Sequence, residues 1–202
     1  MKIGVLGGTF DPIHNGHLSI AGEARARLNL SKVLFVPAAQ PWLKTDRVVT
    51  PVRHRLEMVR RAIAGYPYFE LSTLETDRSG PSYTVDTIAT LRQRLGADAR
   101  IFFLLGWDSL AELPEWKEPA RLVRLCRLVA IARPGLDRPD LEALEIFVPG
   151  ITQSVIWLDV APIDISASAI RAKVSQRLPI SSLVPDVVES YIAENNLYSG
   201  SG

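Results

Sequence analysis

The chain has few of the residues that build covalent or metal-held frameworks. Its 202 residues include one cysteine, Cys126, and three histidines. A single thiol excludes an intramolecular disulfide, and no cysteine and histidine pairs lie at the spacing of a zinc site. We therefore expect a fold that is stabilised by its own apolar core, in the reducing cytoplasm.

Long apolar runs and an excess of one charge are also absent. The apolar run near the N-terminus is shorter than that of a signal peptide, and the best run, residues 101–105, falls far short of the ~20 residues of a membrane span. The 23 basic and 22 acidic residues leave a net charge of +1, so no strong field attracts nucleic acid or an anionic membrane. The sequence thus predicts a globular cytoplasmic protein with neither of these partners, and it leaves the oligomeric state open.

Short apolar runs alternate along the chain with longer segments of helical period. Most of the runs lack a polar face, which is typical of strands that helices cover on both sides. The predicted strands are residues 3–6, 33–36, 69–74, 101–105, 128–132 and 155–160. This order predicts an α/β fold, a Rossmann-like doubly wound parallel sheet of five or six strands with a helical C-terminal subregion. No linker separates two cores, so residues 1–198 are expected to form one domain, with residues 199–202 as a disordered tail.

Signals for helix ends lie between the strands. Thr50 places a capping hydroxyl before Pro51, the expected first residue of a helix that stops at Gly65. Ser166 is expected to cap a later helix. The predicted helices cover residues 16–28, 51–64, 83–95, 140–144 and 185–194, and one more begins at Ser166.

The sharpest motif follows the first predicted strand. Gly7 and Gly8 end this strand, and His14 and His17 flank Gly16 at the start of the next helix. The segment matches neither the dinucleotide-binding nor the phosphate-loop pattern, yet paired glycines let a ligand approach the backbone and helix N-terminal amides favour an anion. Because the two histidines are three residues apart, both imidazoles face the same way and can donate to one polyphosphate.

An ordinary helix start with incidental histidines is the alternative reading of this loop. Two of the chain's three histidines lie in this single turn, which favours a site. The third, His54, lies beside Arg53 and Arg55 on a later helix, and we expect the His54 side chain to be solvated.

Two segments resemble signatures of the nucleotidyltransferases that release pyrophosphate. Residues 14–17 (HNGH) resemble the H-x-G-H motif, and residues 165–171 (ISASAIR) resemble I-S-x-T-x-x-R. Their spacing resembles the bacterial nicotinate-nucleotide adenylyltransferase family, as do GPSYT at 80–84, GWDSL at 106–110, LPEW at 113–116 and RPG at 133–135. The resemblance implies adenylyl transfer from ATP to nicotinate mononucleotide, by in-line attack of the acceptor phosphate on the α-phosphorus, giving deamido-NAD and pyrophosphate in NAD biosynthesis.

The resemblance implies catalytic roles for residues at both ends of the chain. His17 would contact the α-phosphate and His14 the adjacent oxygens, while the planar guanidinium of Arg171 grips the leaving phosphates. Positioning and charge stabilisation would dominate, since the acceptor phosphate is already a nucleophile. The residues implied for ATP binding are Gly7, Gly8, Thr9, Phe10, His14, His17, Gly106, Asp108, Arg133, Ser166, Ser168 and Arg171.

Some of these positions have ordinary structural alternatives. Asp108 binds the ribose of ATP or caps the next helix, and Arg133 frames the adenine or lies in a surface loop. Ser166 and Arg171 would also suit a capped surface helix. Ser168 stands where the family often has threonine, but the hydroxyl is kept.

The acceptor pocket would have to recognise a pyridine carboxylate. Amides at Tyr83 and Thr84, which open a helix, would hold the carboxylate, and Trp116 would stack on the pyridinium ring, unless Trp116 only fills the core. Lys44 is a candidate for neutralising the phosphate. Many family members have histidine where Leu43 stands, so one phosphate donor is missing.

The implied cofactor is Mg²⁺ carried by the phosphates of ATP, since no carboxylate cluster indicates a dedicated metal site. Other H-x-G-H transferases would share the ATP site, so nicotinamide mononucleotide and phosphopantetheine stay open as acceptors. A non-catalytic nucleotide-binding regulator is the third hypothesis. The intact histidines and arginine disfavour it, because a mere binder has no leaving pyrophosphate to hold.

Overall fold

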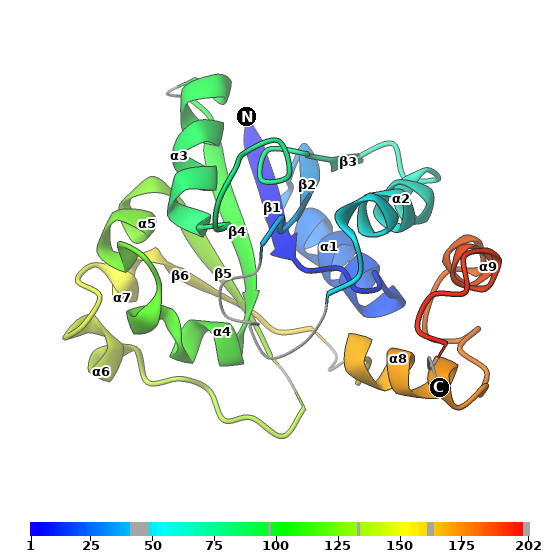
Figure 1. The fold of residues 1–202 in the computed structure, drawn as a ribbon. Coiled ribbons are helices and arrows are strands. Elements are labelled where there is room, and N and C mark those ends of the chain that lie inside the picture. Colours follow the sequence, from blue (N-terminus) through cyan, green and yellow to red (C-terminus); the bar gives the residue numbers. More distant parts are fainter. Residues whose placement is uncertain (41–48, 97, 133, 161–163, 200–202) are drawn as a thin grey trace.

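The computed structural model describes residues 1–40, 49–96, 98–132, 134–160 and 164–199. Its central element is one parallel sheet with the strand order β3-β2-β1-β4-β5-β6 in the described part of the chain (Figure 1). The strands are β1 (Lys2–Gly8), β2 (Lys32–Pro37), β3 (Phe69–Leu71), β4 (Arg100–Gly106), β5 (Arg127–Ile131) and β6 (Val155–Leu158). The expected Rossmann-like α/β fold is thus confirmed.

Each buried strand sends alternate side chains into two separate cores. In β4, Phe102 and Leu104 belong to one core, whereas Ile101, Phe103 and Leu105 belong to the other. This explains why the sequence of the strand has no polar face.

Helices cover both faces of the sheet. The first core is covered by α1 (Asn15–Leu28), α2 (Val52–Ile63), α8 (Ala167–Ser175) and α9 (Asp186–Glu194). The second core is covered by α3 (Thr84–Leu95), α4 (Trp107–Ala111), the 3₁₀ turn η1 (Leu113–Glu115), α5 (Pro119–Leu125), α6 (Leu141–Glu145) and α7 (Ile151–Ser154). No helix of the described residues is long and apolar enough to cross a membrane.

Some expected element ends are wrong. Strand β3 ends at Leu71, not at residue 74, because the chain then folds into a turn in which Thr73 Oγ1 donates to Asp77 Oδ2 at 2.7 Å. The N-cap of α2 is Pro51, so the Thr50 hydroxyl does not cap this helix. Ser166 does cap α8, accepting a hydrogen bond from Ala169 N at 3.2 Å. Residues 200–202 of the expected tail lie outside the described residues.

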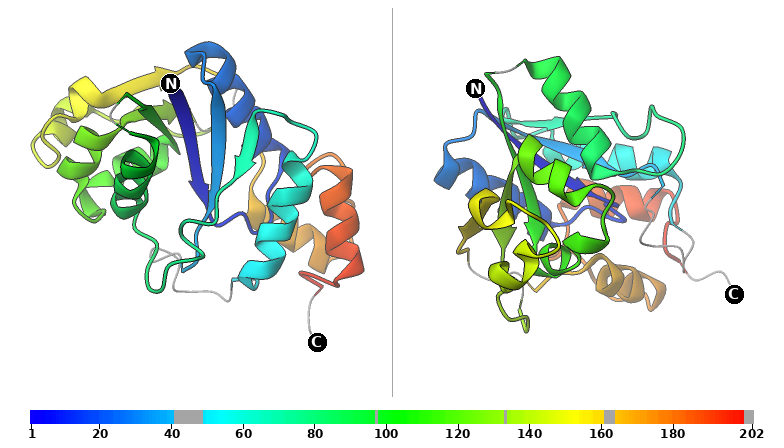
Figure 2. Two further views of the ribbon diagram at one scale, coloured as in Figure 1. Left: turned by 90° about the horizontal axis from the view of Figure 1, so that it is seen from above. Right: turned by 90° about the vertical axis from the view of Figure 1, so that its left-hand side faces the viewer.

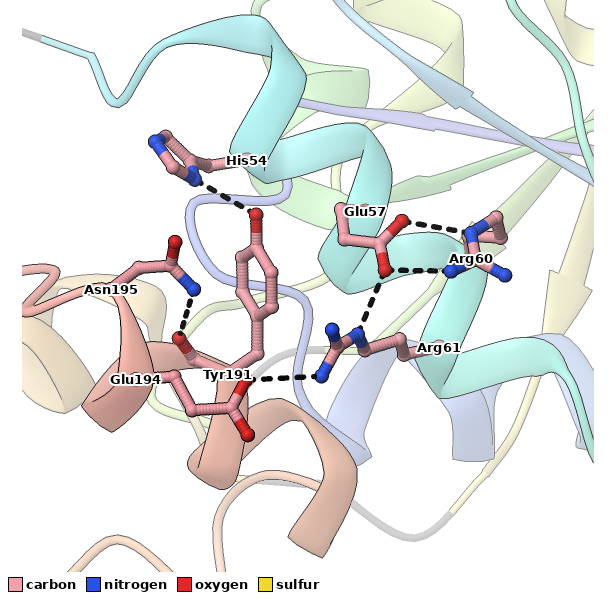
Figure 3. A network of polar contacts seen from close by, with 7 residues as sticks. All are labelled: His54, Glu57, Arg60, Arg61, Tyr191, Glu194 and Asn195. Carbon is pink, nitrogen blue, oxygen red and sulfur yellow. Dashed lines mark hydrogen bonds and ion pairs between the residues drawn. The ribbon is translucent and has the colours of Figure 1, made fainter.

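The last helix, α9, packs against α2 rather than against the sheet alone (Figure 2). His54 on α2 and Tyr191 on α9 share a hydrogen bond of 2.8 Å between Nδ1 and the hydroxyl (Figure 3). Arg61 lies over the Tyr191 ring at 4.6 Å and forms an ion pair with Glu194 at 3.5 Å. His54 is therefore half-buried in a helix–helix contact, and the expectation that it is simply solvated is wrong.

Candidate active site

The loop that follows β1 lies where the strand order of the sheet reverses. From β1 the chain continues to its neighbour β2, whereas the other neighbour, β4, begins the second half of the sheet. In open α/β sheets, a crevice forms at such a point beyond the carboxyl ends of the strands. Gly7 and Gly8 end β1, and Gly106 ends β4, so three of the expected site residues line this edge.

Gly8 lies close to an aromatic ring, which a side chain at this position would crowd. A Cβ at this position would lie 3.2 Å from Cζ of Phe10. Phe10 itself is 2% exposed, with its ring 5.8 Å from Phe35 and 5.0 Å from His17 between centroids. Phe10 therefore fills the core beneath the loop, and a ligand could meet its backbone but not its ring. Thr9, beside it, is also buried.

The two histidines of the loop are stacked on each other. Their ring centroids are 3.7 Å apart and the ring planes differ by 23°. His14 is the N-cap of α1 and is 7% exposed, while His17, in the first turn, is half-buried. The sequence spacing thus correctly places both imidazoles on one side of the helix start.

A backbone hydrogen bond selects the tautomer of His17. Its Nδ1 accepts a hydrogen bond of 3.2 Å from the backbone N–H of His14. A nitrogen that accepts cannot carry the ring proton, so in the neutral ring the proton is on Nε2. His17 is therefore set up to donate a hydrogen bond through Nε2, which suits an anionic phosphate oxygen.

Arg171 reaches the same loop from the other end of the sequence. Its Nη1 donates a hydrogen bond of 2.7 Å to the backbone carbonyl of Asp11, three residues before His14. Arg171 lies one turn into α8, whose start also holds the hydroxyls of Ser166 and Ser168, 3.4 Å apart. The structure thus brings the two motifs of the sequence together at one loop.

Arg55 is a buried structural residue of this site, a role that the sequence patterns did not predict. It is 1% exposed and its guanidinium bonds four backbone carbonyls. These are the carbonyls of Thr9 at 2.8 Å, Ala38 at 2.7 Å, Thr50 at 2.9 Å and Ala39 at 3.3 Å. Burial lowers the pKa of Arg55, and the Asp11 carboxylate acts in the opposite direction. Arg55 therefore ties the loop after β1 to the loop after β2.

Of the residues expected to bind the acceptor, Tyr83, Thr84 and Trp116 lie on neighbouring segments, on the face of the sheet that carries the second core. Tyr83 is the N-cap of α3 and Thr84 its first residue. Lys117, next to Trp116, lies 4.5 Å over the Tyr83 ring, so the two segments are in contact. Trp116 packs edge-on against Phe103 at 6.1 Å, half-buried, and its buried Nε1 has no hydrogen-bond partner among the described residues.

Two hydrogen bonds made by Ser82 join the start of α3 to the loop after β2. Ser82 Oγ accepts from Ala39 N at 2.9 Å, and Ser82 N donates to Gln40 O at 3.2 Å. Beneath it, the carboxylate of Glu75, 7% exposed, accepts a 2.7 Å hydrogen bond from the Thr87 hydroxyl. Burial raises the pKa of Glu75, and the Thr87 hydrogen bond opposes this.

Some expected site residues are placed differently or lie elsewhere. Asp108 is the second residue of α4, whose N-cap is Gly106, so the alternative reading of Asp108 as the cap is wrong. Lys44, Leu43 and Arg133 lie outside the described residues.

Comparison with known proteins first defines the class. Residues 5–173 match the family model described as cytidylyltransferase-like, and the chain belongs to that class of nucleotidyltransferases. The fold agrees with the solved structure of Plasmodium falciparum nicotinic acid mononucleotide adenylyltransferase complexed with NaAD, with a TM-score of 0.80 over 99% of this chain and 98% of that chain, at 22% identity.

The sequence relatives narrow the class. A probable nicotinate-nucleotide adenylyltransferase of Dehalococcoides mccartyi (strain CBDB1) is 46% identical over 98% of this chain and 97% of the relative. One of Thermomicrobium roseum is 45% identical over 98% of this chain and 91% of the relative. The chain belongs to the nicotinate-nucleotide adenylyltransferase family.

Proposed function

We propose that this protein transfers the adenylyl group of ATP to nicotinate mononucleotide, giving deamido-NAD and pyrophosphate. The observation that carries the proposal is the meeting of the stacked His14 and His17 with Arg171 at one loop. This group of donors lies at the carboxyl edge of the sheet, where such folds bind their ligands. Family membership supports the same reaction and this acceptor.

The reaction is a single in-line displacement. A phosphate oxygen of nicotinate mononucleotide forms a bond to the α-phosphorus as the bond to the bridging α,β-oxygen breaks, and pyrophosphate leaves with that electron pair. The attacking oxygen is already an anion, so the protein supplies no base. Its task is to hold the two substrates in line and to stabilise the charge that builds up on the oxygens.

Each donor has a proposed place in this step. The Nε2–H of His17 donates to an α-phosphate oxygen, where charge increases in the transition state, and His14 supports the adjacent oxygens. Arg171 stabilises the β- and γ-phosphates as they leave, with Ser166 and Ser168 at the same helix start. The contact of His17 with the α-phosphate stabilises the charge at the reacting phosphorus, whereas Arg171 and the two serines chiefly hold the leaving pyrophosphate.

The magnesium ion enters as part of the ATP substrate in this proposal. Within the described residues no group of three histidine, cysteine, aspartate or glutamate side chains forms a metal cage, and the donors at the loop are cationic or neutral. Such a site suits a metal that the phosphates carry, and the ion would neutralise part of their charge.

The remaining contacts of the substrates are proposals of the same kind. Asp108 accepts hydrogen bonds from the ribose of ATP, with Arg133 near the adenine. The amides of Tyr83 and Thr84 bind the pyridine carboxylate, Trp116 stacks on the pyridinium ring, and Lys44 neutralises the acceptor phosphate. A cytoplasmic location belongs to this proposal.

A pyrophosphate-release assay tests the function directly. The protein is supplied with ATP and, in parallel, with nicotinate mononucleotide, nicotinamide mononucleotide or phosphopantetheine. We expect the highest kcat/KM with nicotinate mononucleotide. A preference for another acceptor would leave the transfer chemistry intact and overturn the acceptor assignment, whereas ATP binding without turnover on all three would identify a regulator.

A further inference from the structure

Tyr198, which follows α9, makes a direct hydrogen bond to Asp11 in the loop between β1 and α1. The Tyr198 hydroxyl donates to Asp11 Oδ1 at 2.8 Å. Asp11 is 1% exposed, and its second carboxylate oxygen accepts a hydrogen bond of 3.4 Å from Thr50 N. Tyr198 lies four residues beyond the last residue of α9, so this bond joins the C-terminal segment to the turn between β1 and α1.

Charge and burial keep this hydroxyl a donor. Burial raises the pKa of Tyr198 well above its ordinary value, and the Asp11 carboxylate raises it further. The phenol therefore stays protonated across the range in which enzymes are assayed. The buried carboxylate in turn has the guanidinium of Arg55 as its nearby positive charge. The contact is thus a hydrogen bond between a neutral donor and a charge-compensated acceptor, which is stronger than a neutral pair.

Asp11 holds two parts of the proposed machinery at once. Its backbone carbonyl accepts the hydrogen bond from Arg171, and His14 follows three residues later. Any rotation of the peptide at Asp11 would therefore move the partner of the guanidinium and the start of the histidine turn together. Fixing the Asp11 side chain restrains that rotation.

The exit of the loop is held by the same C-terminal region. Asn15 N donates to Leu183 O at 2.9 Å, and Asn15 Nδ2 donates to Ser182 O at 3.1 Å. These two bonds use the backbone of the segment between α8 and α9. Tyr198 is different, because it uses a side-chain hydroxyl that one substitution removes without changing the fold of the backbone.

We infer that Tyr198 is a positioning residue for adenylyl transfer, which acts through Asp11 to hold the loop that carries His14 and the carbonyl partner of Arg171. The inference rests on the proposed function. Tyr198 itself touches no reacting atom. Its effect falls on kcat, because a small displacement of aligned groups slows the step more than it weakens substrate binding.

The test is Tyr198→Phe, with Tyr191→Phe as the matched control. Both substitutions remove one hydroxyl from the C-terminal region, and both hydroxyls take part in hydrogen bonds of 2.8 Å, but the partner of Tyr191 is His54 on α2. We expect Tyr198→Phe to lower kcat about 10-fold, with both KM values and the Tm close to those of the control. An unchanged kcat, or an equal fall in both variants, would overturn the inference.

A double-variant cycle supplies the second measurement. Asp11→Asn keeps an oxygen that accepts from Tyr198 but removes the charge, so it weakens the same contact. If Tyr198 acts through Asp11, the double variant is about as slow as the slower single variant, whereas multiplied effects on kcat would refute the route through Asp11. The wild-type protein tests the proposed function separately: if it prefers another acceptor, the ratios are measured with that one, and if it turns over none, the reaction and this role both fail.

Discussion

At His17, one backbone hydrogen bond decides which ring nitrogen carries the proton, and the chemistry follows from that choice. With Nδ1 accepting from His14 N, Nε2 is the nitrogen that can donate, and we propose that it donates to the α-phosphate. We expect His17→Ala to lower kcat roughly 100- to 1,000-fold while the KM for ATP changes little, because this donor is used most in the transition state. Steady-state pyrophosphate release measures both constants.

His54→Ala is the control for this variant. It removes an imidazole of the same size from α2, where the ring bonds Tyr191 and not the loop. Its kcat should stay near the wild-type value. Turnover of His17→Ala close to wild type would remove His17 from the mechanism, whatever its effect on stability.

Trp116 is the residue proposed to stack on the ring of the other substrate, nicotinate mononucleotide. A half-buried indole next to the start of α3 is suited to stack on a pyridinium ring, an attraction worth about 0.5 to 2 kcal/mol. Trp116→Ala should therefore raise the KM for nicotinate mononucleotide roughly 2- to 30-fold and leave that for ATP unchanged. Trp116→Phe, which keeps an aromatic face, should recover most of the loss. An effect confined to ATP would mean that the pocket is assigned wrongly.

The histidines and Arg55 show which features of the site can be predicted from the sequence and which cannot. Spacing alone places His14 and His17 together, because three residues are one helical turn. Arg55 was missed although a signal was present: it shares the apolar stripe of α2 with Met58, Val59 and Ala62. An arginine on an apolar stripe can be buried when backbone carbonyls accept hydrogen bonds from its guanidinium. For Arg55, most of these carbonyls belong to loops that are distant in the sequence. No local pattern contains them.

Among the elements, α2 and α9 form the contact that secures the C-terminal region. Glu57 bonds both Arg60 and Arg61, and these hydrogen bonds lower its pKa to about 2 (Figure 3). Through Glu57, Arg61 is held over the ring of Tyr191 on α9. The ionised carboxylate therefore contributes stability above the ordinary pKa of about 4.5, and this contribution is lost as the pH falls toward about 2.

Glu57→Gln tests this contact. Because the pairs are partly solvated, we expect a loss of only about 1 kcal/mol in the free energy of unfolding near pH 7. The gap to wild type should narrow below about pH 4.5 and vanish toward pH 2. Urea unfolding at several pH values measures it, with Glu23→Gln, which breaks an exposed pair within α1, as control. A gap that is constant with pH would exclude the charge as its cause.

Among the described helices, the long periodic ones were predictable and so was the short α6, expected at residues 140–144, whereas α4, α5 and α7 were not. Helices such as α1 and α3 carry enough turns for an apolar stripe to be read, with Gly96 ending α3 as expected. The elements α4, α5 and α7 are too short for a period, and they form because the strands before and after them fix their ends. The packing of α9 on α2 joins segments more than 100 residues apart, which local patterns do not encode.

Across the whole molecule, the proposed ATP site joins the first loop of the sheet to α8, so ATP should stabilise the fold by binding both. A ligand at about 100 times its Kd adds about 2.7 kcal/mol, which corresponds to a rise in Tm of roughly 5 to 10 °C for a chain of this length. AMP lacks the β- and γ-phosphates that Arg171 is proposed to hold. The difference between the two ligands therefore reports all the contacts to these phosphates, and the share of the guanidinium is the part that Arg171→Ala removes.

Thermal unfolding of Arg171→Ala with each nucleotide makes this comparison. The Tm of the free variant falls by the loss of the Asp11 contact, so each shift is measured from that new baseline. We expect the ATP-induced rise in Tm to shrink toward that of AMP, while the AMP-induced rise stays as in the wild type. Equal losses with both nucleotides would show that Arg171 shapes the loop and does not meet the leaving phosphates. The histidines and Arg171 come from opposite ends of the sequence. If Arg171→Ala loses part of the ATP-induced rise in Tm but none of the AMP-induced rise, Arg171 binds the outer phosphates of the ATP molecule whose α-phosphate is proposed to bind His17.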